Sequence, residues 1–136
     1  MPTLIYKIAA RGAWQQAERA RRYEGSADDL RDGFIHFSAA EQLAGTLAKH
    51  FAGQEGLVLV AVNADALGDQ LKWEPSRGRD LFPHLYGPLA LDAVIGVVDL
   101  PLDAQGGHDV AGALQKLDKA EKVAQGASEA ARGLAP

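Results

Sequence analysis

The sequence predicts a single α+β domain, and three observations favour this fold class. Five or six short segments have the composition of β-strands, and helical periodicity is confined to two segments early in the chain. These helices are too few to cover both faces of a doubly wound parallel sheet.

Length and composition agree with one globular domain. The chain has 136 residues, of which 47% are apolar and 24% charged, as in ordinary water-soluble proteins. A net charge of −4 gives no sign of a large nucleic-acid-binding surface, although a small nucleotide needs only local positive groups. The absence of cysteine excludes disulfides, thiolate nucleophiles and cysteine-bound metals. No signal peptide or membrane-spanning run is recognisable, so we expect a cytoplasmic protein.

The chain is predicted to begin with a strand at residues 3–8 and a helix from Gly12 to Arg22. Residues 23–31 are polar and rich in turn-forming residues, which predicts a loop. The apolar face of the helix is expected to comprise Ala13, Trp14, Ala17 and Ala20.

The stretch Asp32–Leu43, with the sequence DGFIHFSAAEQL, is the centre of the prediction. Its first half has the apolar pattern of a strand. Because side chains alternate along a strand, we expect His36 and Ser38 on one face and Ile35 and Phe37 on the other. A strand end that presents an imidazole and a hydroxyl together can hold a polar or anionic ligand, or it can form a buried polar pair.

A second helix is predicted from Ser38 to about Phe51. Ser38 followed three residues later by Glu41 indicates a capping box at its start. The stripe expected to pack on a sheet consists of Leu43, Leu47 and Phe51 with Ala40, Ala44 and Ala48 beside them.

The second half of the domain is predicted to be mostly strands. Leu57–Val62 is apolar on both faces and is therefore expected to be an interior strand. Leu71–Glu74 is a short strand, Pro75–Leu81 a loop, and Ala93–Leu100 the last strand of the domain.

The composition changes after residue 102, where we place the boundary between a domain of residues 1–102 and an extension of residues 103–136. Val110–Val123 has a weak amphipathic pattern and predicts a helix. Gly126–Pro136 is expected to be frayed or disordered.

Polar residues that interrupt the apolar pattern gather in three places of the sequence, and together they make up the candidate site. They are Lys7 in the first strand, His36 and Ser38 in the central stretch, and Glu74, Arg77, Arg79, His84 and Tyr86 in the second half. Two arginines in a glycine-containing loop suit a phosphate or carboxylate, because a guanidinium binds two oxygens at once. The competing interpretation is that the loop arginines are simply solvated.

No metal site is predicted, because none of the four histidines is paired at metal-ligand spacing. A site shared by His36 and His84 would require the fold to bring them together, which the sequence leaves open. Phosphate-binding P-loop, GxGxxG and nucleophilic GxSxG motifs are all absent.

Three motifs in a fixed order carry a resemblance to a known family. They are YKI in the first strand, DGFIHFSAAEQL, and FPHLYGPL. Over residues 3–102 the chain resembles the domain of unknown function 952 family, within the ADP-ribosyltransferase-like superfamily. That resemblance implies an ADP-ribosylation-like fold, with split, mainly antiparallel sheets around a cleft that binds NAD in active members. The middle of the chain is also similar to RNA 2′-phosphotransferases, whose H-x-H-x-S strand matches at His36 and Ser38.

The resemblance also implies roles for particular residues. Glu74 would correspond to a catalytic glutamate that stabilises an oxocarbenium-like state, with His36 and Tyr86 as further catalytic candidates. The expected ligand-binding residues are Lys7, Ser38, Arg77, Arg79 and His84. The chain departs from the superfamily in its first strand, where Tyr6 and Lys7 stand in place of a histidine or arginine.

Three functional hypotheses follow. The protein is an ADP-ribosyltransferase-like enzyme acting on NAD or a related nucleotide, or a binding module for a nucleotide or small anionic metabolite. In the third, His36 and His84 are buried polar residues that fix strand register, and the protein acts through an unidentified partner. NAD is expected as a substrate rather than as a resident cofactor.

Overall fold

The computed structural model describes residues 3–119, apart from the side chain of Arg77. The strands are β1 (Leu4–Ala10), β2 (Arg22–Tyr23), β3 (Ile35–His36), β4 (Leu57–Asn63), β5 (Leu71–Pro75), β6 (Leu81–Leu85), β7 (Leu89–Ala90) and β8 (Val94–Leu100). The α-helices are α1 (Arg11–Ala20), α2 (Ala27–Asp32) and α3 (Leu43–His50), and residues 110–119 are also helical. Short 3₁₀ turns are η1 (Ala40–Gln42), η2 (Ala64–Ala66), η3 (Gly68–Gln70), η4 (Arg77–Arg79) and η5 (Leu91–Ala93).

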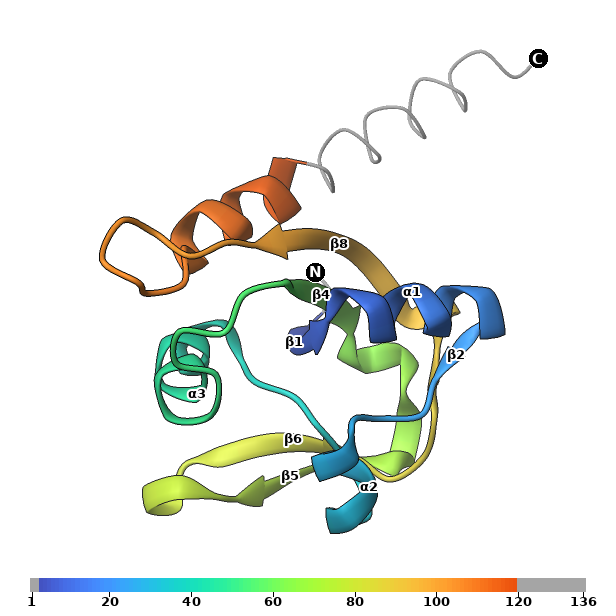
Figure 1. Cartoon of the computed structure of the whole chain (residues 1–136). Coiled ribbons are helices and arrows are strands. Elements are labelled where there is room, and N and C mark those ends of the chain that lie inside the picture. The colour runs from blue at the N-terminus through green and yellow to red at the C-terminus, as the bar shows by residue number, and fades with distance from the viewer. Residues whose placement is uncertain (1–2, 120–136) are drawn as a thin grey trace, which may run out of the picture.

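The strands of the described residues form three antiparallel sheets (Figure 1). Their orders are β1-β4-β8, β2-β7 and β3-β6-β5. Figure 1 shows the β5–β6 hairpin on the opposite side of the molecule from β8, with α3 beside the space between them. The α+β prediction with mainly antiparallel sheets is confirmed.

Strand β4 lies at the centre of the first sheet and is buried on both faces, as its continuous apolar run predicts. Val58, Val60 and Val62 belong to one core cluster, which includes Trp14 of α1. Leu57, Leu59 and Ala61 belong to the other cluster, together with Leu43 and Leu47 of α3. The sheet therefore separates two cores, which we call the inner core (the cluster with Trp14) and the outer core (the cluster with Leu43 and Leu47).

The apolar faces predicted for the two helices are confirmed only in part. In α1, Trp14 and Ala17 are buried, whereas Ala13 and Ala20 are exposed. In α3 the leucines are buried, while Ala44 and Ala48 face solvent. Trp14 of α1 and the leucines of α3 contribute most to this packing, because large apolar side chains remove more area from water.

The prediction of a loop at residues 23–31 is wrong, because most of α2 lies in this segment. Ser26 caps the helix: its hydroxyl accepts the Asp29 N–H at 3.2 Å, and the Asp29 carboxylate accepts the Ser26 N–H at 2.8 Å. Gly33 ends it with a φ of 86°, a conformation that glycine adopts readily. The helix has only 6 residues, too few to show helical periodicity in the sequence.

The capping box predicted at Ser38 is also wrong. The backbone of Ser38 instead forms a two-way bridge with Tyr6 of β1, with N···O distances of 2.8 and 2.9 Å. Ser38 Oγ lies 3.1 Å from Thr46 Oγ1 rather than on a helix amide. Because the bridge keeps Ser38 extended, α3 starts later, at Leu43.

The helix at residues 110–119 packs on the outer core, where Ala113 and Leu117 are 2% and 7% exposed. Residues 120–123, the last part of the helix predicted to end at Val123, and Gly126–Pro136, for which fraying was expected, lie outside the described residues. Within the part of the chain that is described, no helix has both the length and the apolar character needed to cross a bilayer.

Candidate functional site

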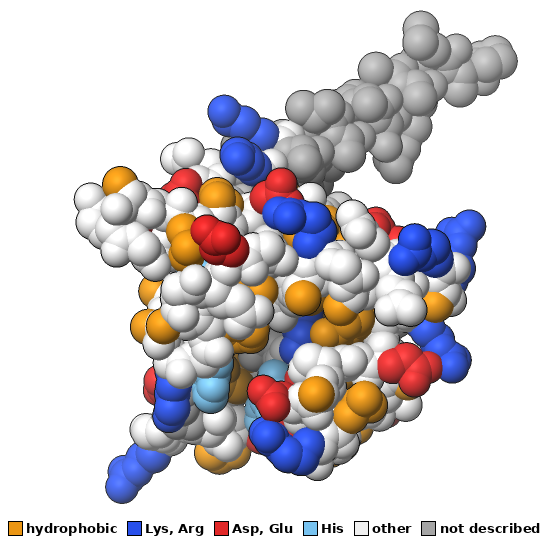
Figure 2. Space-filling model, viewed as in Figure 1, with side chains coloured by type: hydrophobic (Ala, Val, Ile, Leu, Met, Phe, Trp, Pro, Cys, Tyr) orange, Lys and Arg blue, Asp and Glu red, His pale blue; other side chains and the backbone are white. Residues whose placement is uncertain are grey.

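A pocket of about 350 Å³ opens where β1 and β3 diverge beyond the Tyr6–Ser38 bridge. This volume lies in the range of roughly 300–1,000 Å³ that is typical of small-molecule sites. Its polar lining includes Lys7, Asp29, His36, Ser38, Lys49 and His84. Figure 2 shows the hollow, with histidine atoms inside it and acidic and basic side chains around its edge.

One face of the β3-β6-β5 sheet supplies the floor. His36 is directly opposite His84 in the strand register, and their ring centroids are 5.5 Å apart. Phe34 stacks on His84 with a centroid distance of 4.1 Å. The predicted alternation holds here, since Ile35 and Phe37 are buried in the core on the other face. The fold therefore brings the two histidines together, which the sequence alone left open.

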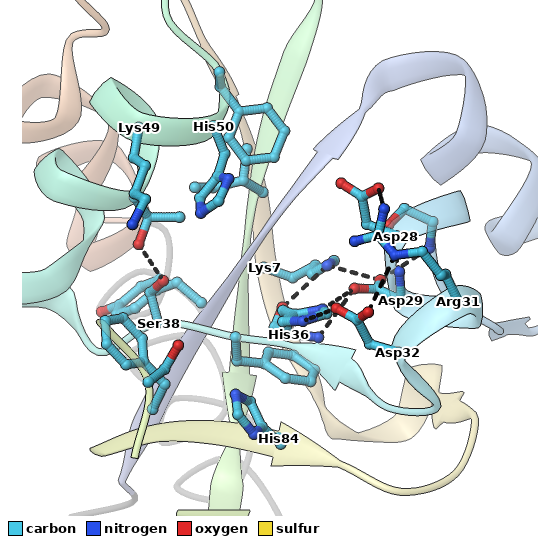
Figure 3. Close-up of a pocket in the computed structure, with 18 residues that line it drawn as sticks. Lys7, Asp28, Asp29, Arg31, Asp32, His36, Ser38, Lys49, His50 and His84 are labelled. Atoms are coloured by element: carbon cyan, nitrogen blue, oxygen red, sulfur yellow. Dashed lines mark hydrogen bonds and ion pairs between the residues drawn. The ribbon is translucent and has the colours of Figure 1, made fainter. Parts of the chain in front are cut away.

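A buried ion pair contacts His36 (Figure 3). Lys7 Nζ is 2.8 Å from Asp29 Oδ2 and donates to the His36 carbonyl at 3.0 Å. The other oxygen, Asp29 Oδ1, is 2.6 Å from His36 Nδ1. Lys7 and Asp29 are only 5% and 2% exposed, so each depends on the other for charge compensation.

The surroundings shift the pKa values of this pair. Burial alone would raise the pKa of Asp29, but the hydrogen bond from His36 and the charge of Lys7 lower it well below its ordinary value. Burial lowers the pKa of Lys7, although the Asp29 charge opposes that shift. Asp29 is therefore a carboxylate at neutral pH.

Both ring nitrogens of His36 face carboxylates. Nε2 lies 3.0 Å from Asp32 Oδ2, while Nδ1 contacts Asp29. Ionised carboxylates only accept hydrogen bonds, so both contacts are hydrogen bonds only when the ring carries two N–H groups. The hydrogen bond from Arg31 is the main cause that lowers the pKa of Asp32.

A second histidine–carboxylate contact supports the floor from the side of β5. His84 Nδ1 lies 2.9 Å from Glu74 Oε1, and the Tyr86 hydroxyl donates to the same oxygen at 2.7 Å. The bond from Tyr86, followed by that from His84, lowers the pKa of Glu74, and the same contact raises the pKa of Tyr86. His84 therefore links Glu74 to the pocket lining.

The structure separates the residues expected in the site into two groups. Lys7, His36, Ser38 and His84 line the pocket. In the second group, the carboxylate of Glu74 contacts both His84 and Tyr86. Arg79 is exposed in η4, in the turn between β5 and β6, and the backbone of Arg77 lies in the same turn.

The sequence analysis missed residues on both walls of the pocket. Asp29 and Asp32 come from α2, which was expected to be a loop, although Ser26, Asp29 and Gly33 carried a recognisable capping signal. Lys49 and His50 come from the last turn of α3, where cations are usual and give no separate signal of a site. Among residues 3–119, no group of three histidine, aspartate or glutamate side chains is arranged to hold a metal ion.

The family of this chain follows from comparison with known proteins. The sequence profile of the family described as "Protein of unknown function (DUF952)" matches residues 8–97. The crystal structure of protein CC0527 from Caulobacter crescentus is 54% identical, with a TM-score of 0.79, and the match covers 83% of this chain and 99% of that chain. Its solution NMR structure is 55% identical, with a TM-score of 0.73 and coverage of 81% and 95%.

No curated protein shows a significant match to this chain. The family profile spans more than half of the residues of the chain. The chain therefore belongs to the DUF952 family.

Proposed function

We propose that this protein binds a nucleotide, NAD or a close relative, in the pocket between α2 and α3. The proposal includes membership of the ADP-ribosyltransferase-like superfamily and an ADP-ribosylation-like fold. Its support is the resemblance of the strand through His36 and Ser38 to nucleotide-processing enzymes, together with the pocket beside that strand.

The observation that carries the proposal is the pairing of His36 with His84 on the floor of a cavity whose walls carry both acidic and basic side chains. A nucleotide presents phosphates, ribose hydroxyls and a flat base. Cationic side chains bind the phosphates, carboxylates accept hydrogen bonds from the hydroxyls, and aromatic rings stack on the base. Lys49, Asp32 and Phe82 supply one group of each kind to the lining.

Binding without turnover is the form of the proposal that the geometry supports best. Glu74, the residue with the expected catalytic role, contacts His84 but is not part of the pocket lining. Turnover of NAD is the second candidate. It is favoured by the hydrogen bonds of Tyr86 and His84 to Glu74, because these keep the carboxylate ionised and fixed beside a pocket residue.

Thermal unfolding in the presence of ligand tests the proposal. NAD and ADP-ribose at well above their dissociation constants should raise the melting temperature, because a ligand that binds only the folded state stabilises it. The His36→Ala variant should lose this shift, whereas His108→Ala, a histidine outside the pocket lining, should keep it. Absence of any shift in the wild-type protein with nucleotides would contradict the proposal. Release of nicotinamide from NAD, measured on the same samples, distinguishes turnover from binding.

A further inference from the structure

We infer that Lys49, at the end of α3, forms the subsite for the phosphate groups of the bound nucleotide. This inference deepens the proposed function and rests on it for the identity of the ligand. It concerns the α3 wall of the pocket, which the sequence and the family resemblance leave without a role.

The first step is the charge balance of the opposite wall. Each of the three pocket carboxylates has a cationic or histidine partner. Asp28 pairs with Arg31 at 3.2 Å, Asp29 with Lys7 at 2.8 Å, and Asp32 with Arg31 through the 3.1 Å contact to Nε. Both cations of this wall, Lys7 and Arg31, are thus held by carboxylates, and His36 is a further partner of Asp32.

Lys49 is in a different position. Its side chain lines the same pocket from the last turn of α3 but forms no ion pair or hydrogen bond with another side chain or a carbonyl of residues 3–119. Figure 3 shows Lys49 and His50 on the α3 side, across the pocket from Asp28, Asp29 and Asp32. Among the described residues, Lys49 is thus the pocket cation that no carboxylate holds, and it lies on the side away from the acidic residues, where it can attract an anion.

The neighbouring groups fit a phosphate. Ser38 and Ser76 bring hydroxyls to the lining, and His50 adds an imidazole next to Lys49. Lysine binds phosphate as a flexible point charge, so an exposed amine at the pocket edge can follow the ligand into place. The ribose hydroxyls would then extend toward the carboxylates of α2, which accept hydrogen bonds.

A purely structural explanation exists for Lys49, because a cation in the last turn of a helix interacts favourably with the helix dipole. That explanation predicts an effect of Lys49 on stability alone. The phosphate subsite predicts an effect on the affinity for phosphate-bearing ligands, so the two are separable.

Calorimetric titration of three probes tests the subsite: ADP-ribose, adenosine and inorganic pyrophosphate. The variants are Lys49→Gln and, as a matched control, Lys116→Gln, an exposed helical lysine outside the pocket lining. We expect Lys49→Gln to weaken binding of ADP-ribose by about three- to tenfold, and the effect to shrink at high salt. The affinity for adenosine should not change in Lys49→Gln, and Lys116→Gln should bind all probes as the wild type does.

The outcomes separate the subsite from the proposed function. Wild-type affinity of Lys49→Gln for ADP-ribose, or an equal loss for adenosine, would overturn the subsite while leaving nucleotide binding intact. Binding of pyrophosphate that depends on Lys49, without binding of ADP-ribose or adenosine, would support an anion site and contradict the nucleotide assignment. Failure of the wild-type protein to bind any of the three probes would overturn both.

Discussion

At the scale of single residues, Asp29 organises the site. Its two carboxylate oxygens receive contacts from Lys7 Nζ, the His36 ring and the backbone N–H groups of Ser26 and His36. One side chain therefore neutralises a buried lysine, orients a pocket histidine and caps a helix. Such a fully satisfied buried carboxylate is costly to disturb, because removing one partner leaves the others uncompensated.

Replacing Asp29 by asparagine should strongly destabilise the fold. The substitution leaves the buried amine of Lys7 without a countercharge, and loss of one partner of a buried ion pair costs about 3–5 kcal/mol. Asp28→Asn is the control, because its contact with Arg31 is exposed and such pairs contribute about 1 kcal/mol or less. Urea denaturation of both variants measures the difference, and equal midpoints would refute the role assigned to Asp29.

The same carboxylate makes stability depend on pH. The pKa of Asp29 is lower in the folded state than the value of about 3.9 expected in the unfolded chain. Its contribution is therefore present above about pH 4 and is lost as the pH falls toward the folded-state pKa. We expect the gap in unfolding free energy between wild type and Asp29→Asn to narrow between about pH 5 and pH 2. A gap that stays constant over this range would show that Asp29 does not change its pKa on folding.

At the scale of elements, α2 is a short helix whose formation builds one wall of the pocket. It delivers Asp29 to the buried ion pair and Asp32 to the second nitrogen of His36. With 6 residues it is too short to be stable by itself, so its caps and its tertiary contacts hold it in place.

Removing the cap with Ser26→Ala should lower the unfolding free energy by about 1 kcal/mol, because the Asp29 N–H loses its acceptor. Ser26→Asn keeps a capping oxygen and should stay close to wild type. Chemical denaturation gives the stability of each variant, and NMR chemical shifts of His36 report whether the pocket wall moves with the cap. Equal stability of the two variants would mean that the cap does not support α2.

At the scale of the whole molecule, the first sheet separates two cores, and the site is lined by residues of both β1 and β3. The inner core joins α1 and all three sheets, whereas the outer core joins α3 and the helix at residues 110–119. The backbone bridge between Tyr6 and Ser38 links the first sheet to the strand of the third. The floor of the pocket is therefore attached to the most buried part of the fold.

The helix at residues 110–119 should contribute to the stability of the domain, although the sequence placed it in an extension. Leu117 is 7% exposed and packs in the outer core, so Leu117→Ala should cost about 2–4 kcal/mol. Lys116→Ala, one residue earlier and exposed, should change stability little. Differential scanning calorimetry of both variants tests whether the boundary at residue 102 divides two independent parts. A Leu117→Ala variant with the wild-type melting temperature would support that boundary.

Much of the architecture could be predicted because it depends on long, regular patterns. The continuous apolar run of β4 indicated an interior strand, and alternation placed His36 and Ser38 on the face opposite Ile35. The errors fell where local patterns are short or ambiguous. The 6 residues of α2 gave no periodicity, and Ser38 carried a capping signal that its bridge to Tyr6 overrides.

By itself, the sequence determined the fold class, the interior position of β4, the face on which His36 lies, and the family resemblance. Only the tertiary structure decided which polar residues share a pocket. Strand pairing set His36 beside His84, and α2 brought Asp29 to Lys7 across 22 positions of the chain. Such contacts depend on sheet register and chain path, which are set by the packing of the whole core rather than by the spacing of the residues involved.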